Sequence, residues 1–436
     1  MILSVKVKQG LFRFAEIIHL RIFGYEMGDE MRRFLGNLSW SFFGGLIGAG
    51  VLFGINIIFG RIFGPEEYGR YSLIVALSGI FTVFMTMGSE TAVVHYVAKD
   101  EKQEPGRYIT SAFIIWIVAT SLWGALFFFL SIYLPSFFQQ GIAEVALTAI
   151  FFAIVLSGKT VMDGCIRGLQ LFQFQSLIRM IEVAIVLLVF FLGIFFLGGK
   201  IGGVWLYIGS LSCGLILASL FFLRKISVFF SWIYWWDIKK MLLYGMYALL
   251  GSLSGIFLNS FDKLIIADSL GNESLGIYNA YFSASLLLVG QLMAVFVNVF
   301  FPTLSRMNQG EGLLKKLNCL SKKMFPIMFI GLFVFISIAI YLFGNEYPFD
   351  FFLLLEFSLL GCLTAYFYAL WWLIAAKSHS GIQFTSFHGI IGGLVFVFPA
   401  FFFGAHIGLR GVVLLLILSL TYNIVIGNIR YGHIKE

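Results

Sequence analysis

The chain has 436 residues, of which 60% are hydrophobic and 12% are charged. Soluble proteins carry about a quarter charged residues, so an ordinary soluble globule is excluded. The formal net charge of +7 does not indicate nucleic-acid binding, because the basic residues fall in alternate loops between apolar segments. Apolar runs of about 20 residues recur from Trp40 to Ile429. We therefore expect an all-α polytopic membrane protein with about twelve transmembrane helices.

Residues 1–38 form an N-terminal cytoplasmic or interfacial extension in our interpretation. The apolar stretch 11–23 is interrupted by four polar residues, and no small-residue cleavage site follows it, so it does not match a secretory signal. Either this stretch lies in the membrane interface as an amphipathic helix, or residues 1–30 precede the true start at Met27 or Met31.

The predicted spans divide the chain into an N-lobe (39–223), an interfacial linker (224–241), a C-lobe (242–429) and a cytoplasmic tail (430–436). The linker is rich in Trp and has basic ends, as suits the headgroup layer. The twelve spans are 39–60, 71–97, 108–133, 142–163, 176–197, 203–223, 242–266, 277–301, 324–343, 350–376, 383–403 and 409–429.

Lysine and arginine predict the orientation. Of the 29 basic residues, 24 fall in the two termini and in the loops on one side of the predicted spans. By the positive-inside rule this side is cytoplasmic. We predict a multi-pass protein of the cell (inner or plasma) membrane with both termini in the cytoplasm.

One stretch occurs twice. RIFGPEEYGRYS (61–72) recurs as DSLGNESLGIYN (268–279), displaced by 207 residues, and the preceding apolar run follows the same offset. Such a repeat indicates a duplicated unit. The offset spans six helices, an even number, so both copies keep one orientation. We expect two parallel six-helix lobes around a central cavity, related by an axis along the membrane normal. Gly-x-x-x-Gly pairs in the first and seventh spans predict close helix packing.

Motifs for chemistry are missing from the sequence. Ser157–Thr160 ends like a P-loop, but the position that needs the first glycine holds Ala153, within an apolar helix. The four cysteines and six histidines show no metal-ligand or catalytic spacing. We predict no enzyme activity, no cofactor and no metal, and leave open whether transport is coupled to protons or sodium.

Charged and amide side chains inside spans are costly and are usually functional. Lys159, Asp163 and Glu356 carry an equally plausible structural interpretation as end-of-span charges or self-satisfied pairs. Arg179 and Glu182, three residues apart, can share a helix face, as can Asn259 and Lys263. The candidate substrate-binding residues are Arg179, Glu182, Arg167, Glu90, Asn259, Asp262, Lys263, Gln291 and Asn298.

The chain resembles a known family in several stretches. These are FGPEEYGRYSL after the first span, MGSETAVVHYVAKD ending the second, CIRGLQLFQFQS after the fourth, and NSFDKLIIADSLGNESLGIYNAYFSAS with FVNVFFPTLSRM in the second half. In this order and spacing they resemble Wzx-type polysaccharide flippases of the multidrug/oligosaccharidyl-lipid/polysaccharide flippase superfamily. The resemblance is strongest over residues 35–310.

That resemblance implies a flippase for O-antigen or capsule repeat units. Its cargo would be a polyprenyl-diphosphate-linked oligosaccharide, moved from the cytoplasmic to the outer leaflet by alternating access. Membrane lipid and other membrane proteins of glycan assembly are the expected partners, and nucleic acid is not. The alternative is a cation-coupled multidrug or small-molecule exporter of the same superfamily. A more distant one is a non-transporting membrane scaffold or a glycan polymerase.

Overall fold

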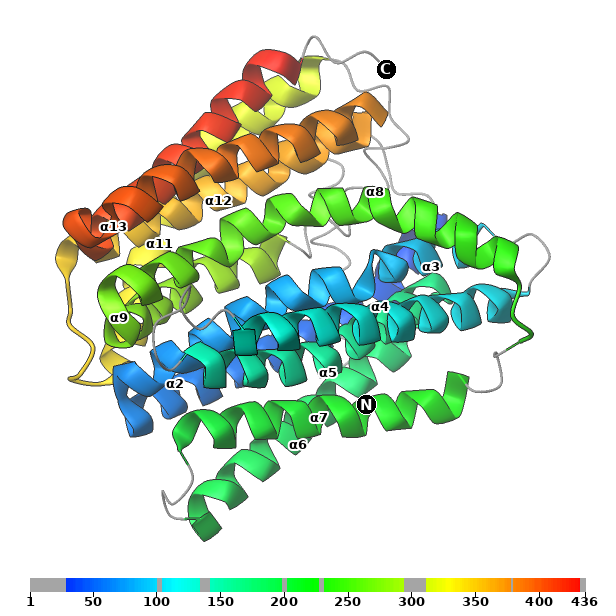
Figure 1. Ribbon diagram of the computed structural model, residues 1–436. Coiled ribbons are helices and arrows are strands. Elements are labelled where there is room, and N and C mark those ends of the chain that lie inside the picture. Colours follow the sequence, from blue (N-terminus) through cyan, green and yellow to red (C-terminus); the bar gives the residue numbers. More distant parts are fainter. Residues whose placement is uncertain are drawn as a thin grey trace, which may run out of the picture.

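The structure is a computed structural model and describes residues 29–99, 104–133, 142–197, 202–226, 231–293, 311–377 and 379–431. Within these ranges the chain forms helices joined by short turns, without strands. The helices, most of them labelled in Figure 1, are α2 (Asp29–Thr86), α3 (Ser89–Ala98), α4 (Pro105–Tyr133), α5 (Ile142–Gly168), α6 (Phe172–Leu197), α7 (Gly203–Ile226), α8 (Trp235–Asn259), α9 (Phe261–Phe282), the π-helical η2 (Ser283–Leu287), α11 (Glu311–Phe343), α12 (Phe351–Lys377) and α13 (His379–Arg430).

Nine helical segments of the described chain are long and apolar enough to cross a membrane. Two of them, Gly45–Thr86 and Gln383–Arg430, have 42 and 48 residues, whereas one crossing needs about 20 residues. Each therefore holds two crossings, and Gly64 and Gly408, both at positive φ, mark the turns between them. With α8, these segments account for the twelve predicted spans. The predicted all-α polytopic class is confirmed.

Several predicted boundaries were wrong. Span 71–97 is broken because Met87 and Gly88 have φ of 46° and 70°, after which α3 begins as a separate helix. Helix α8 begins at Trp235, inside the predicted linker, and α11 begins at Glu311, well before the predicted start at 324. The predicted extension up to residue 28 and the end of span 277–301 lie outside the described residues.

The two copies of the repeated turn have the same backbone conformation. Gly64 has φ 79° and ψ 173°, and Gly271 has φ 86° and ψ 170°. This region of the Ramachandran map is essentially restricted to glycine. Pro65 follows Gly64 as the first residue of the next helix, where its missing N–H costs no hydrogen bond. The repeat in the sequence therefore corresponds to a repeat in the backbone.

The two turns pack against each other through a reciprocal contact. A Cβ atom on Gly69 would lie 1.8 Å from the carbonyl oxygen of Asn272, and one on Gly276 would lie 1.8 Å from that of Pro65. The offset of 207 residues makes Gly69 equivalent to Gly276 and Pro65 equivalent to Asn272. Self-complementary contacts of this kind are typical of a two-fold relation. Figure 1 shows α2 and α9 side by side at this end, which we call the turn end.

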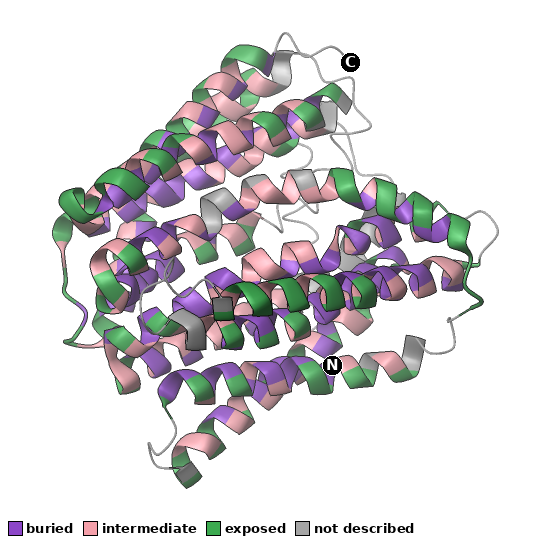
Figure 2. Ribbon diagram, viewed as in Figure 1, coloured by how far each residue is buried: buried purple, intermediate pink, exposed green. Residues whose placement is uncertain are grey.

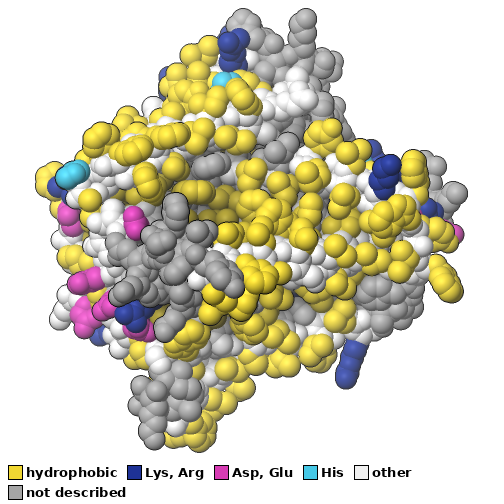
Figure 3. Space-filling view, in the orientation of Figure 1, with side chains coloured by type: hydrophobic (Ala, Val, Ile, Leu, Met, Phe, Trp, Pro, Cys, Tyr) yellow, Lys and Arg dark blue, Asp and Glu magenta, His cyan; other side chains and the backbone are white. Residues whose placement is uncertain are grey.

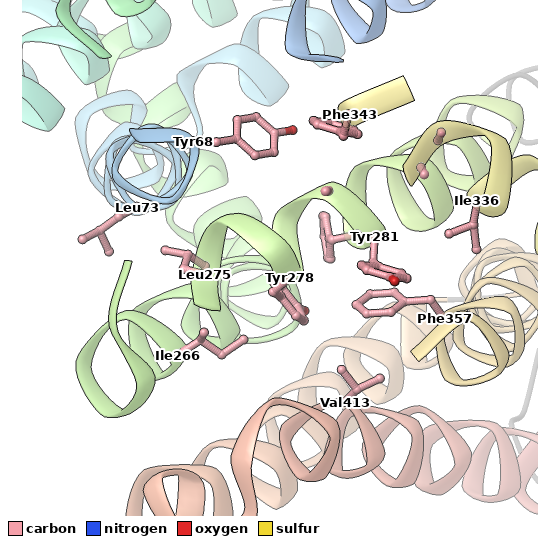
Figure 4. Packing of buried hydrophobic residues seen from close by; sticks show 14 of the residues in the cluster. Tyr68, Leu73, Ile266, Leu275, Tyr278, Tyr281, Ile336, Phe343, Phe357 and Val413 are labelled. Atoms are coloured by element: carbon pink, nitrogen blue, oxygen red, sulfur yellow. The ribbon is translucent and has the colours of Figure 1, made fainter. Parts of the chain in front are cut away.

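The loop between α11 and α12, residues 344–350, also joins the two halves at the turn end. The hydroxyl of Tyr347 donates to the carbonyl oxygen of Gly60 at 3.2 Å. The rings of Phe343 and Tyr68 lie 5.4 Å apart and face each other in Figure 4. Burial raises the pKa of Tyr347, with Glu346 contributing, so the hydroxyl stays protonated and remains a donor.

The opposite end, which we call the linker end, joins α8 to the first half of the chain. Arg107, on α4, donates from Nε and Nη2 to the two carboxylate oxygens of Asp237 at 2.7 and 3.0 Å. The Asp237 side chain is only 2% exposed. A Cβ atom on Gly245 would lie 2.4 Å from the carbonyl oxygen of Met87, so backbone meets backbone there. The N-terminal half of α8 is thus fixed to the N-lobe.

Side chains sort by environment as expected for a membrane protein. In Figure 2 the purple, buried residues lie mostly where helices face each other and many outward faces are exposed. Figure 3 shows that hydrophobic side chains cover most of the surface in this view, with Asp and Glu gathered at the turn end. Lys and Arg appear mainly toward the other end and the top. Lipid is the medium that suits such an apolar surface.

Candidate functional site

Two adjacent helices of the N-lobe bring four charged side chains together. On α5, Lys159 lies four residues before Asp163, and its Nζ is 2.7 Å from both carboxylate oxygens. On α6, Arg179 lies three residues before Glu182, and Nη1 donates to Oε1 at 3.0 Å. The second oxygen of Glu182 lies 3.8 Å from Lys159 Nζ. The four residues form one network, which we call the α5–α6 ion network.

Burial differs sharply within this network. The side chains of Lys159 and Glu182 are 8% and 6% exposed, whereas that of Arg179 is 37% exposed. Charges removed from water must be paired, and removing one partner of a buried pair costs about 3–5 kcal/mol. Lys159 and Glu182 therefore hold the network in place. Arg179 is its most accessible member.

Helix α2 closes one side of the network. A Cβ atom on Gly48 would lie 3.3 Å from Arg179 Cγ and 3.5 Å from Val183 Cγ2, so glycine lets α6 approach closely here. The predicted Gly-x-x-x-Gly packing is otherwise wrong for the side chains that the structure describes. A Cβ atom on Gly50, Gly54 or Gly255 would meet nothing within 4 Å. Close backbone approaches are made instead at other glycines, among them Gly69, Gly276, Gly245 and Gly164.

Glu90 lies on α3 and Arg167 lies on α5, and these two helices of the N-lobe contact each other. The backbone of Glu90 packs on α5, because a Cβ atom on Gly164 would lie 2.6 Å from its carbonyl oxygen. Among the described residues the buried Glu90 Oε2 has no hydrogen-bond partner. Arg167 is exposed, and its Nε donates to the carbonyl oxygen of Asp163 at 3.3 Å. Arg167 thus adds a second accessible guanidinium on α5.

The C-lobe holds a separate, fully buried pair. Asp262 accepts hydrogen bonds from Tyr278 at 2.6 Å and from Lys263 Nζ at 3.2 Å. The Lys263 ammonium also lies 3.7 Å from the centre of the Phe282 ring, a cation–π contact. The side chains of Asp262 and Lys263 are 0% and 8% exposed. In this conformation these two residues bind each other, and no cargo group reaches them from solvent.

The remaining predicted pairs are not tested by the described residues. Asn259 is the last residue of α8 and Lys263 lies on α9, with Ser260 between the two helices, so the shared face that we predicted for Asn259 and Lys263 stays a prediction. The side chain of Asn259 lies outside the described part of the structure. Gln291 is exposed. Asn298 also lies outside the described residues, so the pairing of Gln291 with Asn298 stays a prediction.

Lys159 and Asp163 were recognised in the sequence as charges inside a span, but they were not predicted to bind substrate. The close approach of α6 to α2 at Gly48 was not predicted either. The signal for the first pair was present, because a lysine and an aspartate four residues apart share a helix face. Their link to Glu182 depends on how α5 packs on α6, which no local pattern encodes. Tyr278 was recognised only as a residue of the repeat, and its hydrogen bond to Asp262 was not predicted.

Comparison with known proteins supplies the family. A family model described as polysaccharide biosynthesis protein matches residues 34–308, which is more than half of the chain. The chain belongs to the polysaccharide biosynthesis protein family. The resemblance to Wzx-type flippases is thereby confirmed, and so is the prediction of a transporter for polysaccharide biosynthesis. No curated protein matches the chain.

Solved structures confirm the two-lobed fold. The chain is 17% identical to a MATE transporter in complex with MaD5, with a TM-score of 0.61, covering 93% of this chain and 97% of that one. The outward-facing conformation of a multidrug resistance MATE family transporter of the MOP superfamily gives 17% identity and a TM-score of 0.58 over the same shares. A MOP superfamily transporter from Pyrococcus furiosus, described as having a binding pocket of reverse polarity, gives 18% and 0.57, covering 94% and 100%. Family and fold together are those of a multi-pass membrane transporter rather than of a catalytic enzyme.

Proposed function

We propose that the protein moves a polyprenyl-diphosphate-linked oligosaccharide from the cytoplasmic to the outer leaflet of the cell membrane, as in O-antigen assembly. In this proposal both termini and the linker end are cytoplasmic, and the turn end is the outer side. The carrying observation is the α5–α6 ion network, which offers one accessible guanidinium backed by buried charges.

The network is suited to bind an anion and to release it. Its two cations and two carboxylates balance when it is empty. A phosphate can take Arg179 from Glu182, because guanidinium binds phosphate bidentately and in a strong, charge-assisted way. Lys159 already lies 3.8 Å from the second oxygen of Glu182. It can therefore pair with the carboxylate that Arg179 leaves, so the buried Glu182 keeps a cationic partner while Asp163, whose side chain is 27% exposed, remains in contact with solvent.

The membrane potential favours the proposed direction. A lipid diphosphate carries roughly two negative charges, and each gains about 2.3 kcal/mol per 100 mV on leaving a negative interior. Transport of this kind needs no nucleotide hydrolysis. Coupling to protons or sodium is compatible with the same geometry.

The test uses substitutions at Arg179 in cells that depend on this protein for a surface glycan. Arg179→Ala is expected to abolish glycan display and to accumulate the lipid-linked intermediate, whereas Arg179→Lys retains part of the activity. Arg70→Ala is the matched control, because Arg70 is also a partly exposed arginine paired with carboxylates on its own helix, but at the turn end. Normal glycan display by a stably inserted Arg179→Ala protein would refute the assignment.

The alternative, export of a cationic drug or small molecule, is favoured by the likeness to multidrug MATE transporters and by the buried Glu90 Oε2, which has no hydrogen-bond partner among the described residues. A cationic cargo needs unpaired carboxylates, whereas both carboxylates of the α5–α6 ion network are already neutralised by cations. Export would show as drug sensitivity after deletion, with surface glycan unchanged.

A further inference from the structure

A second site lies in the C-lobe, away from the α5–α6 ion network. Helices α11, α12 and α13, which run side by side in Figure 1, line an open cavity of about 680 Å³, in which Leu320, Met324 and Phe325 are exposed. This volume falls within the range of about 300–1,000 Å³ that ligand sites occupy. Most of its lining is apolar and includes Leu317, Met324, Met328, Cys362, Leu363 and Ile424. A hollow along α6 is lined by residues of that helix alone.

One end of the cavity is polar and built from all three helices. Asn318 Nδ2, on α11, donates to Asn428 Oδ1, on α13, at 3.1 Å. The hydroxyl of Tyr366, on α12, lies 3.0 Å from the same oxygen and also contacts the Asn318 side chain. Asn428 Nδ2 is held in turn by the carbonyl oxygen of Ile424 at 2.9 Å. These bonds fix the polar end before any ligand arrives.

The polarity of the lining changes along α11. Asn318, Ser321 and Lys322 occupy the first turns, whereas from Met324 to Met328 every lining residue is apolar. Eleven residues separate the first and last lining positions of α11, which corresponds to about 16 Å of helix. Pro326 lacks an N–H group and cannot donate to the carbonyl oxygen of Lys322, which bends helices and frees an acceptor. The cavity therefore has a cationic, hydrogen-bonding end and a long apolar end.

We propose that this cavity binds the phosphate-bearing end of a polyprenyl chain, with the phosphate at Lys322 and the first isoprene units along Met324, Met328 and Leu363. The inference rests on the proposed function, since it assigns a place to the lipid part of the same cargo. Charge complementarity with Lys322 supports a phosphate, and the apolar lining that continues from Met324 to Met328 supports an isoprenoid chain beside it. Lys322 and Arg179 lie in different lobes, so they would bind the phosphate-bearing end of the cargo at successive steps of transport.

The experiment measures binding directly, without transport. Purified full-length protein in detergent is titrated with a fluorescent polyprenyl phosphate, and with the same fluorophore on polyprenol and on phosphatidylglycerol. Leu363→Trp, which adds bulk inside the cavity, should weaken binding of polyprenyl phosphate about tenfold or more. Lys322→Gln should weaken it about threefold and leave polyprenol binding unchanged.

Matched controls come from the same helix. Lys323→Gln removes a neighbouring exposed lysine that does not line the cavity, and Ile338→Trp adds the same bulk on an exposed face of α11. Both should bind polyprenyl phosphate as the unmodified protein does. Leu363→Met, which keeps the volume, should also bind normally and shows that any loss in Leu363→Trp comes from the added bulk.

Two results would overturn the proposal. Equal affinity for phosphatidylglycerol would make the cavity a general phospholipid site, and unchanged binding by Leu363→Trp would place the chain elsewhere. The Arg179→Ala protein separates the two proposals, because it should lose transport and keep polyprenyl phosphate binding in this cavity. If the cargo assignment fails in cells while binding at Leu363 persists, the lipid site stands without the flippase assignment.

Discussion

The reciprocal contact at the turn end makes a quantitative prediction for Gly276→Ala. A Cβ atom at Gly276 would lie 1.8 Å from the carbonyl oxygen of Pro65, whereas real Cβ contacts do not fall below 3.0 Å. The helices must separate by the difference, at least 1.2 Å, along that direction. Because the neighbour is backbone, no side chain can rotate away. Overpacking of this kind costs about 1–3 kcal/mol and occasionally more, and here it acts only on the state in which the turn end is closed.

Gly276→Ala should therefore shift the population toward conformations open at the turn end. The assay is the labelling rate of a single cysteine, Asn345→Cys, in the neighbouring loop of a cysteine-free protein. A shift of about 2 kcal/mol in the closing equilibrium corresponds to roughly a thirtyfold change in the open fraction. Gly69→Ala should act alike, and the two changes together should be less than additive because they strain one contact. Gly209→Ala, where a Cβ atom meets nothing within 4 Å, is the control. Equal labelling of all three single variants would refute the reciprocal contact.

Two further predictions rest on described contacts, and a third rests on the distribution of Lys and Arg in the sequence. Arg107→Ala leaves the buried Asp237 carboxylate without its partner and should lower the free energy of unfolding by about 3–5 kcal/mol, measured by denaturation in detergent; an unchanged midpoint would contradict the pairing. Tyr347→Phe removes the donor to the carbonyl oxygen of Gly60 and should cost about 1 kcal/mol of turn-end closure, seen as faster labelling of Asn345→Cys. Asn272→Cys and Gln309→Cys, each alone in a cysteine-free protein, should be labelled from opposite sides of the membrane, and labelling of both from one side would end the twelve-span topology.

Much of the fold could be predicted because the bilayer imposes it. Apolar runs of sufficient length become helices, since a backbone in lipid must satisfy its own hydrogen bonds. The repeat around Gly64 and Gly271 was visible because both positions need a conformation that only glycine adopts easily. The break at Met87–Gly88 was not visible. The break depends on the backbone of Gly245, which approaches from a helix more than 150 residues later in the chain. The apolar composition of the segment does not predict a contact of this kind.

The candidate site was predicted in part for a similar reason. Arg179 and Glu182 pair within one helix, so their spacing was sufficient. Lys159 pairs with Asp163 within α5, so this spacing was sufficient as well. Its proximity to Glu182 depends on the packing of α5 against α6 and could not be predicted from the spacing. The interruption at Ser260 was not predicted, because no glycine or proline marks it. Spacing along the sequence predicts which side chains share a face within one helix, but it does not predict contacts between helices.

The pairing of Arg107 with Asp237 also bears on how the protein is made. The two residues are 130 positions apart in the chain. At a synthesis rate of roughly 5–20 residues per second, Arg107 emerges roughly 7–26 s before its partner exists. Arg107 therefore enters the membrane with the helices of the N-lobe before Asp237, its partner in the ion pair, has been synthesised. The N-lobe can complete its ion pair at the linker end only after the start of α8 has been synthesised, so the two halves of the chain first join when synthesis has passed its midpoint.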